Sequence, residues 1–205
     1  EYGKTPIERM EETGVLQCGV LAAHCVHLTD DDIALMAKYH VRVAHNPGSN
    51  MKLASGISPV PKLRQAGVCV ALGTDGASSN NNLDMLEEIR LAALLHKVDT
   101  LDPLAVPALE ALKMGTEYGA EAVGLSRLGR LEEGFKADIS FFDMESAAWY
   151  PRHDLLSLLV YSANSSSVDS VMIDGKMVME KGQLLTLDEE RILYEANRCA
   201  MALTK

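Results

Sequence analysis

Three short apolar runs, each followed by a turn or helical sequence, constrain the fold of this chain more than any other feature. They cover residues 19–24, 41–45 and 68–73. Short apolar runs that alternate with helices are typical of βα units, which build a parallel sheet. The runs end at His24, at His45 and just before Asp75. Because the carboxyl ends of parallel strands carry the catalytic groups of barrel enzymes, we expect these side chains to share one face of a barrel.

Helix signals separate the three runs. Thr29 and Asp32 have the spacing of a capping box, which predicts the start of a helix that ends near Tyr39. Asn46-Pro47-Gly48, directly after the second run, predicts a turn. Helical patterns follow near residues 60–66 and again after the third run. The order of these signals predicts an α/β fold.

The second half of the chain has a different pattern. Residues 137–143 predict one strand, and residues 168–181 predict two strands joined at Asp174-Gly175, a strong hairpin signal. After Asp188 the apolar residues recur at helical spacing, and we expect this tail to pack as a terminal helix. The sequence therefore predicts that the βα units are succeeded by a small β module and then by a terminal helix.

The βα part is too short to form a closed barrel. Eight βα units need ~250 residues, so the first ~125 residues hold only about four. An open parallel sheet leaves unpaired backbone groups at its edges, and we expect another segment to complete it. The chain also begins with Glu1 instead of a methionine, which suggests that it starts partway through something larger.

Composition narrows the classes of partner. A net charge of −10 and a pI near 5.0 argue against nucleic acid binding, which needs clustered Lys and Arg. No apolar run reaches the roughly eighteen residues of a membrane span, so we expect no membrane partner either. The four cysteines form no Cys-x-x-Cys pair, which favours a reducing cytoplasm over an oxidising compartment. A small molecule is the expected partner.

Four segments together resemble the amidohydrolase superfamily, and within it the methylthioadenosine/S-adenosylhomocysteine deaminases. These segments, in chain order, cover residues 23–28, 45–56, 72–81 and 129–138. The resemblance implies that residues 1–126 are the C-terminal portion of a (β/α)8 barrel, strands 6 to 8 with their helices. It further implies that residues 127–186 are part of a small β-sandwich, and residues 187–205 form the C-terminal helix.

The same resemblance implies a metal site with one divalent ion, zinc in preference to iron. In these enzymes the ion is bound by an H-x-H on strand 1, a histidine on strand 5 and an aspartate on strand 8. Asp75 matches that aspartate, and His24 matches a strand-6 histidine that contacts the attacking water. The H-x-H and the H-x-x-E of strand 5 are absent from this sequence, so the other ligands are expected outside this chain. His27 and Ser78 are weaker candidates for substrate contacts.

These residue types suit hydrolytic deamination. Neutral water is a weak nucleophile, and a bound metal lowers its pKa towards ~7. Asp75 would coordinate the ion and take the proton of the water, while His24 would orient the oxygen; both would also contact the substrate. We therefore expect the parent protein to deaminate a purine nucleoside: 5'-methylthioadenosine, S-adenosylhomocysteine or adenosine. The resemblance also implies that the parent protein is a homo-oligomer. Catalytic zinc needs three protein ligands, so the chain alone is expected to bind metal weakly and to be inactive.

Other interpretations stay open. Guanine deaminases and triazine or chloro-hydrolases share the barrel and its aspartate, and a non-catalytic amidohydrolase-like scaffold would share only the fold. Taken alone, Asp75 would be an ordinary turn residue and His24 a histidine satisfied at a strand end. His45 is expected to brace its own loop through a backbone hydrogen bond, without a catalytic role. His96 is expected to interact with a helix dipole.

Overall fold

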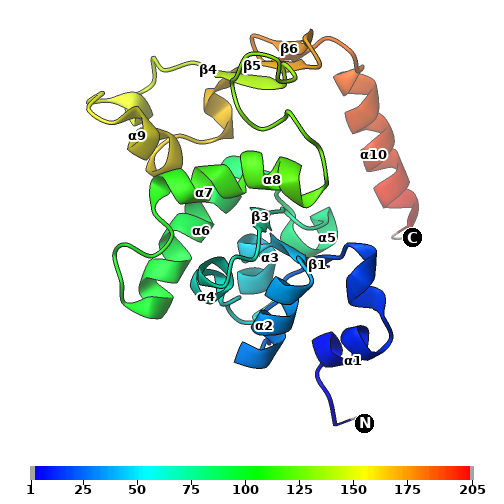
Figure 1. The fold of residues 1–205 in the computed structure, drawn as a ribbon. Coiled ribbons are helices and arrows are strands. Elements are labelled where there is room, and N and C mark those ends of the chain that lie inside the picture. The colour runs from blue at the N-terminus through cyan, green and yellow to red at the C-terminus, as the bar shows by residue number, and fades with distance from the viewer. Residues whose placement is uncertain (1–2, 204–205) are drawn as a thin grey trace.

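The computed structural model describes residues 3–203 and contains two sheets of different kinds (Figure 1). The first is a parallel sheet of three strands in the order β1-β2-β3. The second is an antiparallel sheet of four strands in the order β4-β5-β6-β7. The predicted α/β class is therefore confirmed. The strands are β1 (Leu21–Ala23), β2 (Arg42–His45), β3 (Val70–Leu72), β4 (Ile139–Phe142), β5 (Val168–Ile173), β6 (Lys176–Glu180) and β7 (Gln183–Leu184).

Helices surround the parallel sheet and connect the two parts of the chain (Figure 1). The helix α6 packs against α3, α7, α9 and β3, so it links the βα units to the second half. The α-helices are α1 (Pro6–Glu12), α2 (Asp30–Lys38), α3 (Pro47–Lys52), α4 (Val60–Gln65), α5 (Ala77–Asn80), α6 (Met85–Thr100), α7 (Ala108–Met114), α8 (Glu117–Ala122), α9 (Leu155–Tyr161) and α10 (Glu189–Leu203). Short 3-10 helices are η1 (Val15–Cys18), η2 (Ala147–Trp149) and η3 (Ser165–Ser167).

The three predicted apolar runs form the three parallel strands. Val43 and Val70 are paired in register and are fully buried. Their burial places the core between the sheet and its helices, in the cluster that also includes Met36 and Leu63. On the edge strand β1, by contrast, Leu21 keeps 45% of its surface exposed. The apolar residues of β2 and β3 thus form the core, with all three residues of β3 buried, and within residues 3–203 no strand pairs with the outer edge of β1.

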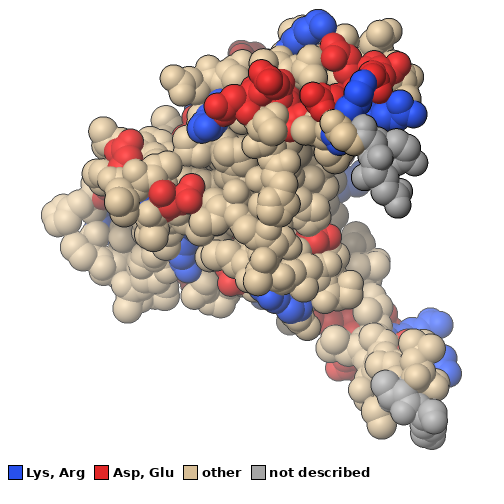
Figure 2. All heavy atoms as spheres, turned by 90° about the horizontal axis from the view of Figure 1, so that it is seen from below, with Lys and Arg blue, Asp and Glu red and all other residues tan. Residues whose placement is uncertain are grey.

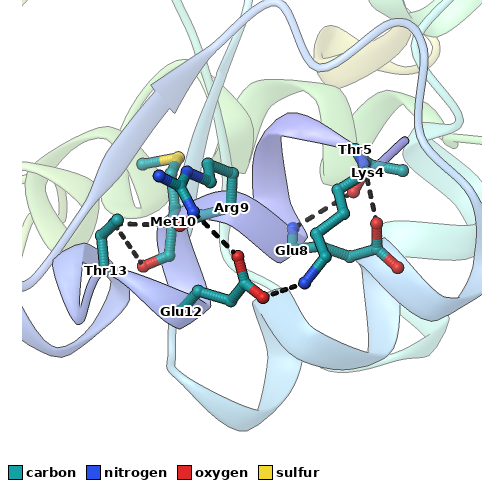
Figure 3. A network of polar contacts seen from close by, with 7 residues as sticks. All are labelled: Lys4, Thr5, Glu8, Arg9, Met10, Glu12 and Thr13. Carbon is teal, nitrogen blue, oxygen red and sulfur yellow. Dashed lines mark hydrogen bonds and ion pairs between the residues drawn. The ribbon is translucent and has the colours of Figure 1, made fainter. Parts of the chain in front are cut away.

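Capping boxes fix the starts of the first two helices. At α2, Thr29 Oγ1 accepts from the Asp32 amide, and the Asp32 carboxylate accepts from the Thr29 amide, as the spacing predicts. At α1, Thr5 and Glu8 form the same reciprocal pair (Figure 3). A capping box satisfies backbone donors that the helix cannot pair internally. Because these signals span four residues, the sequence alone can specify them.

The turn predicted at Asn46-Pro47-Gly48 is wrong. Pro47 and Gly48 instead begin the helix α3, which continues to Lys52. Proline is favoured at the first position of a helix because its fixed φ suits the helix and its missing N–H would have no helical partner there. Ser49 and Asn50 are consequently buried on a helix directly after β2.

The second half forms the predicted β module, but its tail does not pack as predicted. The hairpin between β5 and β6 turns at Asp174 and Gly175, both with positive φ. The tail forms α10 at the predicted position. However, α10 contributes no buried residue, and in Figure 1 it lies apart from α7 and α8. Apolar side chains such as Leu193 and Leu203 remain exposed, because no described segment of the chain covers them.

Charged side chains are distributed without a large basic area on the face drawn in Figure 2. Lys and Arg occur there in small groups beside Asp and Glu, around a broad area that carries neither kind of charge. Among residues 3–203 no helix has the length and apolar character to cross a membrane.

Candidate functional site

His24 follows β1 directly and is held by the backbone and by a neighbouring helix. Its backbone amide donates to the Ala44 carbonyl at 2.9 Å, which continues the pairing of β1 with β2. Its φ of 65° turns the chain out of the strand. The ring Nδ1 lies 2.8 Å from Oδ1 of Asn50, a buried residue of α3. With Nδ1 donating its proton to this amide oxygen, Nε2 is left with a free lone pair.

Asp75 occupies the loop after β3, where a φ of 60° again turns the chain sharply. Its Oδ2 accepts from the Ser49 hydroxyl at 2.7 Å, and its Oδ1 accepts from the Gly76 amide at 2.7 Å. These hydrogen bonds, that of Ser49 foremost, lower the pKa of Asp75 below its ordinary value. Asp75 is therefore a carboxylate at neutral pH and can act as a ligand or as a proton acceptor.

His24 and Asp75 meet although β2 lies between their strands. His24 Nε2 and Asp75 Oδ2 are 3.8 Å apart, and the side chains keep 41% and 27% of their surfaces exposed. At this distance one water molecule or ion can contact both atoms. The exposed fractions mean that a ligand can reach them. The structure thus brings together the two side chains that the sequence analysis singled out.

His45, the third polar strand end, does not join them. It is fully buried, and its Nε2 lies 3.2 Å from Nε2 of His96, which is fully buried on α6. The expectations of a loop brace for His45 and of a helix-dipole contact for His96 are therefore wrong. Burial lowers the pKa of His45 to about 3 and that of His96 to about 4, so both rings are neutral. The rings are 5.1 Å apart between centroids, tilted by 44°. This pair belongs to the packing between β2 and α6.

The two weaker candidates lie in the chain segments that follow His24 and Asp75. His27 is exposed in the loop before α2 and lies beside Gly56. Ser78 is exposed on α5, where its backbone carbonyl accepts from Lys52 Nζ at 3.4 Å. Its neighbour Ser79, and not Ser78, contributes a hydrogen bond that lowers the pKa of Asp75.

Two further residues of the site were missed by the sequence analysis. Ser49 and Asn50 are neighbours on α3, and one contacts Asp75 while the other contacts His24. Both lie inside residues 45–56, a segment that carried the family resemblance. No local pattern marked them, because polar residues after Pro-Gly are equally typical of an ordinary turn.

The donor set of this site is suited to part of a metal centre. A carboxylate with a lowered pKa and an imidazole with a free Nε2 are both common ligands of divalent ions. Within residues 3–203, however, no three His, Cys, Asp or Glu side chains lie together as a group that could hold an ion. Further ligands would have to come from outside these residues.

Known proteins match the chain along nearly its whole length. A model of the amidohydrolase family matches residues 2–178. A 5-methylthioadenosine/S-adenosylhomocysteine deaminase from Syntrophomonas wolfei is 53% identical over 205 residues, which are 99% of this chain and 48% of that protein. The chain spans about half the length of the curated relatives that it matches.

Solved structures agree with this relationship. An adenosine deaminase from Xanthomonas campestris with bound zinc has a TM-score of 0.93 and 38% identity, over 97% of this chain and 45% of that one. A zinc complex of an atrazine chlorohydrolase from Arthrobacter aurescens has a TM-score of 0.89 and 31% identity, over 96% of this chain and 44% of that one.

Proposed function

The chain belongs to the amidohydrolase family, and on this basis we propose that the protein of which it forms part hydrolytically deaminates an adenine nucleoside. The substrate class is 5'-methylthioadenosine, S-adenosylhomocysteine or adenosine, as the names of the relatives suggest. The observation that carries this proposal is the approach of His24 Nε2 to Asp75 Oδ2, 3.8 Å, at the carboxyl ends of two parallel strands.

The same relationship supports a proposal for the fold of the whole protein. We propose that residues 1–126 form the strands 6 to 8 side of a (β/α)8 barrel, with the missing strands paired beyond the open edges. Residues 127–186 would be part of a β-sandwich, and residues 187–205 a terminal helix. The exposed apolar side chains of α10 support this view, since an amphipathic helix normally buries its apolar face against a partner. The remaining half of the protein would supply that partner.

Asp75 would hold a divalent ion, zinc in preference to iron, together with ligands from the remaining half. The lowered pKa of Asp75 supports this role, because a metal ligand must be deprotonated. When bound, such an ion would lower the pKa of a water molecule towards neutrality. The zinc named in two of the similar structures is consistent with this choice.

His24 and Asp75 would act together on the attacking water. Asp75 Oδ2 faces His24 and can accept the proton that the attacking water loses. His24 Nε2, free because Nδ1 donates to Asn50, can accept a hydrogen bond from that water and hold its oxygen toward the substrate. In the net reaction, water adds to the amidine carbon that carries the amino group of the adenine, ammonia leaves, and the inosine analogue remains.

A chimaera tests this proposal. In it, the present chain replaces the matching segment of the S. wolfei deaminase, to which it is 53% identical. We expect the zinc-loaded chimaera to release ammonia from 5'-methylthioadenosine, S-adenosylhomocysteine or adenosine, with the His24→Asn variant as inactive control.

The same assay includes guanine and atrazine, because a chlorohydrolase is among the similar structures. Turnover of one of these, and of no adenine nucleoside, would move the function to that branch of the family. A folded, zinc-loaded chimaera without turnover of any compound would favour a non-catalytic scaffold.

A further inference from the structure

Glu88 is a buried carboxylate that the proposed mechanism does not use. It lies in the first turn of α6, and only 2% of its surface is exposed. Burying a carboxylate costs free energy unless strong hydrogen bonds compensate, and burial here raises the pKa of Glu88 above its ordinary value. Its position therefore needs a structural reason.

An acid in the first turn of a helix often stabilises the helix dipole. That explanation is insufficient for Glu88. The adjacent Glu87 lies in the same first turn with an exposed side chain, so the dipole can be satisfied without burying a second acid.

The two carboxylate oxygens of Glu88 connect two short helices. Oε2 accepts from the Gly48 amide at 2.9 Å, at the start of α3. Oε1 accepts from the Asn80 side-chain amide at 2.8 Å, at the end of α5. The fit at Gly48 is close, because a Cβ atom there would overlap Glu88 Oε1. Each oxygen thus has its own donor, and the donors lie on α3 and α5, the helices that follow β2 and β3.

Both helices carry residues that contact the candidate site or the residue next to it. From α3, Asn50 contacts His24 at 2.8 Å and Ser49 contacts Asp75 at 2.7 Å. From α5, Asn80 donates also to the Thr74 carbonyl at 2.8 Å, and Thr74 precedes Asp75. A displacement of α3 or of Asn80 would therefore move the atoms that orient the site.

We propose that Glu88 is a positioning residue that holds His24 and Asp75 in place through α3 and α5, the helices after β2 and β3. This inference rests on the proposed function of the site. Glu88 does not contact His24 or Asp75 itself, and its effect passes through Asn50, Ser49 and Asn80.

The variant Glu88→Gln in the chimaera tests this role with little change of volume. Gln presents one acceptor and one donor to a place that holds two donors, so one of the two hydrogen bonds is lost. We expect kcat to fall roughly tenfold to a hundredfold, the range found when residues behind metal ligands are replaced. The matched control is Glu87→Gln, the same chemical change one residue earlier, which should leave kcat within about twofold.

A readout without metal separates positioning from general loss of stability. Nitrogen-15 NMR of histidine-labelled, zinc-free chimaera reports which ring nitrogen of His24 carries the proton, with His24→Asn to assign the signal. We expect the Nδ1–H form in the parent chimaera and in Glu87→Gln. In Glu88→Gln, the loosened Asn50 should let the Nε2–H form become populated. A thermal midpoint for each variant shows that the proteins compared are folded.

A double-mutant cycle tests the path through α3. If Glu88 acts through Asn50, then Glu88→Gln should lower kcat much less in the Asn50→Ala background than in the parent. If Glu88→Gln does not fold, Asn80→Ala removes one of the two links and should lower kcat and shift the His24 proton in the same direction.

Unchanged kcat and an unchanged His24 proton in whichever of these variants folds would overturn the inference while the proposed function stands. A parent chimaera without deaminase activity would instead refute the proposed function, and the NMR signal would still decide the role of Glu88.

Discussion

Lowering the pH from about 7 to about 5 is expected to destabilise this protein through the buried pair of His45 and His96. Both rings are fully buried, with their Nε2 atoms 3.2 Å apart. Their Nδ1 atoms have no hydrogen-bond partner, so a proton added there would be a buried charge without compensation. Burial therefore lowers the pKa of His45 from 6.5 to about 3 and that of His96 from 6.5 to about 4.

The direction of the effect follows from the lowered pKa values. Below pH 6.5 the histidines of the unfolded chain bind protons that the native rings do not accept. The contribution of the two neutral rings to the free energy of unfolding is therefore fully present above pH 6.5 and is lost as the pH drops toward 4 and 3. Each pH unit in this window is worth about 1.4 kcal/mol per histidine. At about pH 5 each ring then costs about 2 kcal/mol of stability, or about 4 kcal/mol for the pair.

Urea denaturation of the chimaera at several pH values measures this loss. The variant His96→Leu removes one of the two rings and should reduce the pH-dependent loss by about half. Replacing the exposed His153 by Asn should leave the pH-dependent loss of stability unchanged. Because the variants are compared at the same pH, the contributions of the other titrating residues cancel. A loss of the same size in His96→Leu and in the parent would refute the assignment to this pair.

Three further predictions concern the candidate site. Asp75→Asn should lower kcat of the chimaera roughly a thousandfold, about 4 kcal/mol of transition-state stabilisation, and weaken zinc binding. Steady-state kinetics and metal analysis measure the two effects, and an unchanged zinc content would contradict the prediction. Ser49→Ala should raise the pKa of Asp75, because the hydrogen bond that most lowers it is lost, so the acid limb of the kcat/KM profile should move to higher pH. The isolated 205-residue chain should bind zinc weakly and turn over no adenosine; stoichiometric zinc together with ammonia release would show that the other half is not needed.

Local signals predicted much of the fold correctly. The capping box at Thr29 and the hairpin at Asp174-Gly175 each involve only a few consecutive residues, and both are present in the structure. The apolar runs became strands because a parallel sheet buries such runs against helices. The strand ends drew attention to three polar residues, and the family resemblance selected His24 and Asp75 among them. These two side chains meet in the structure, whereas His45 is buried away from them.

Predictions failed where the outcome depended on a partner elsewhere. The segment after His45 has the residues of a turn, but burial of Ser49 and Asn50 against the site favours the helix α3. The tail has the pattern of a packing helix, yet no described segment of the chain covers α10. The periodicity of apolar residues indicates which side chains a helix can bury. Whether these side chains are buried depends on a neighbouring surface that packs against the helix.

The sequence by itself determined where the strands end and how the second helix begins, because each of these depends on residues close together in the chain. The choice of His24 and Asp75 for the chemistry came from the resemblance of several segments to one family. Tertiary structure alone decided what those side chains touch. Asn50 lies 26 residues from His24, Glu88 lies 40 from Gly48, and His96 lies 51 from His45. No local pattern encodes such contacts, since they form only when β2, β3 and α6 pack together and the burial of each polar group must be compensated by another.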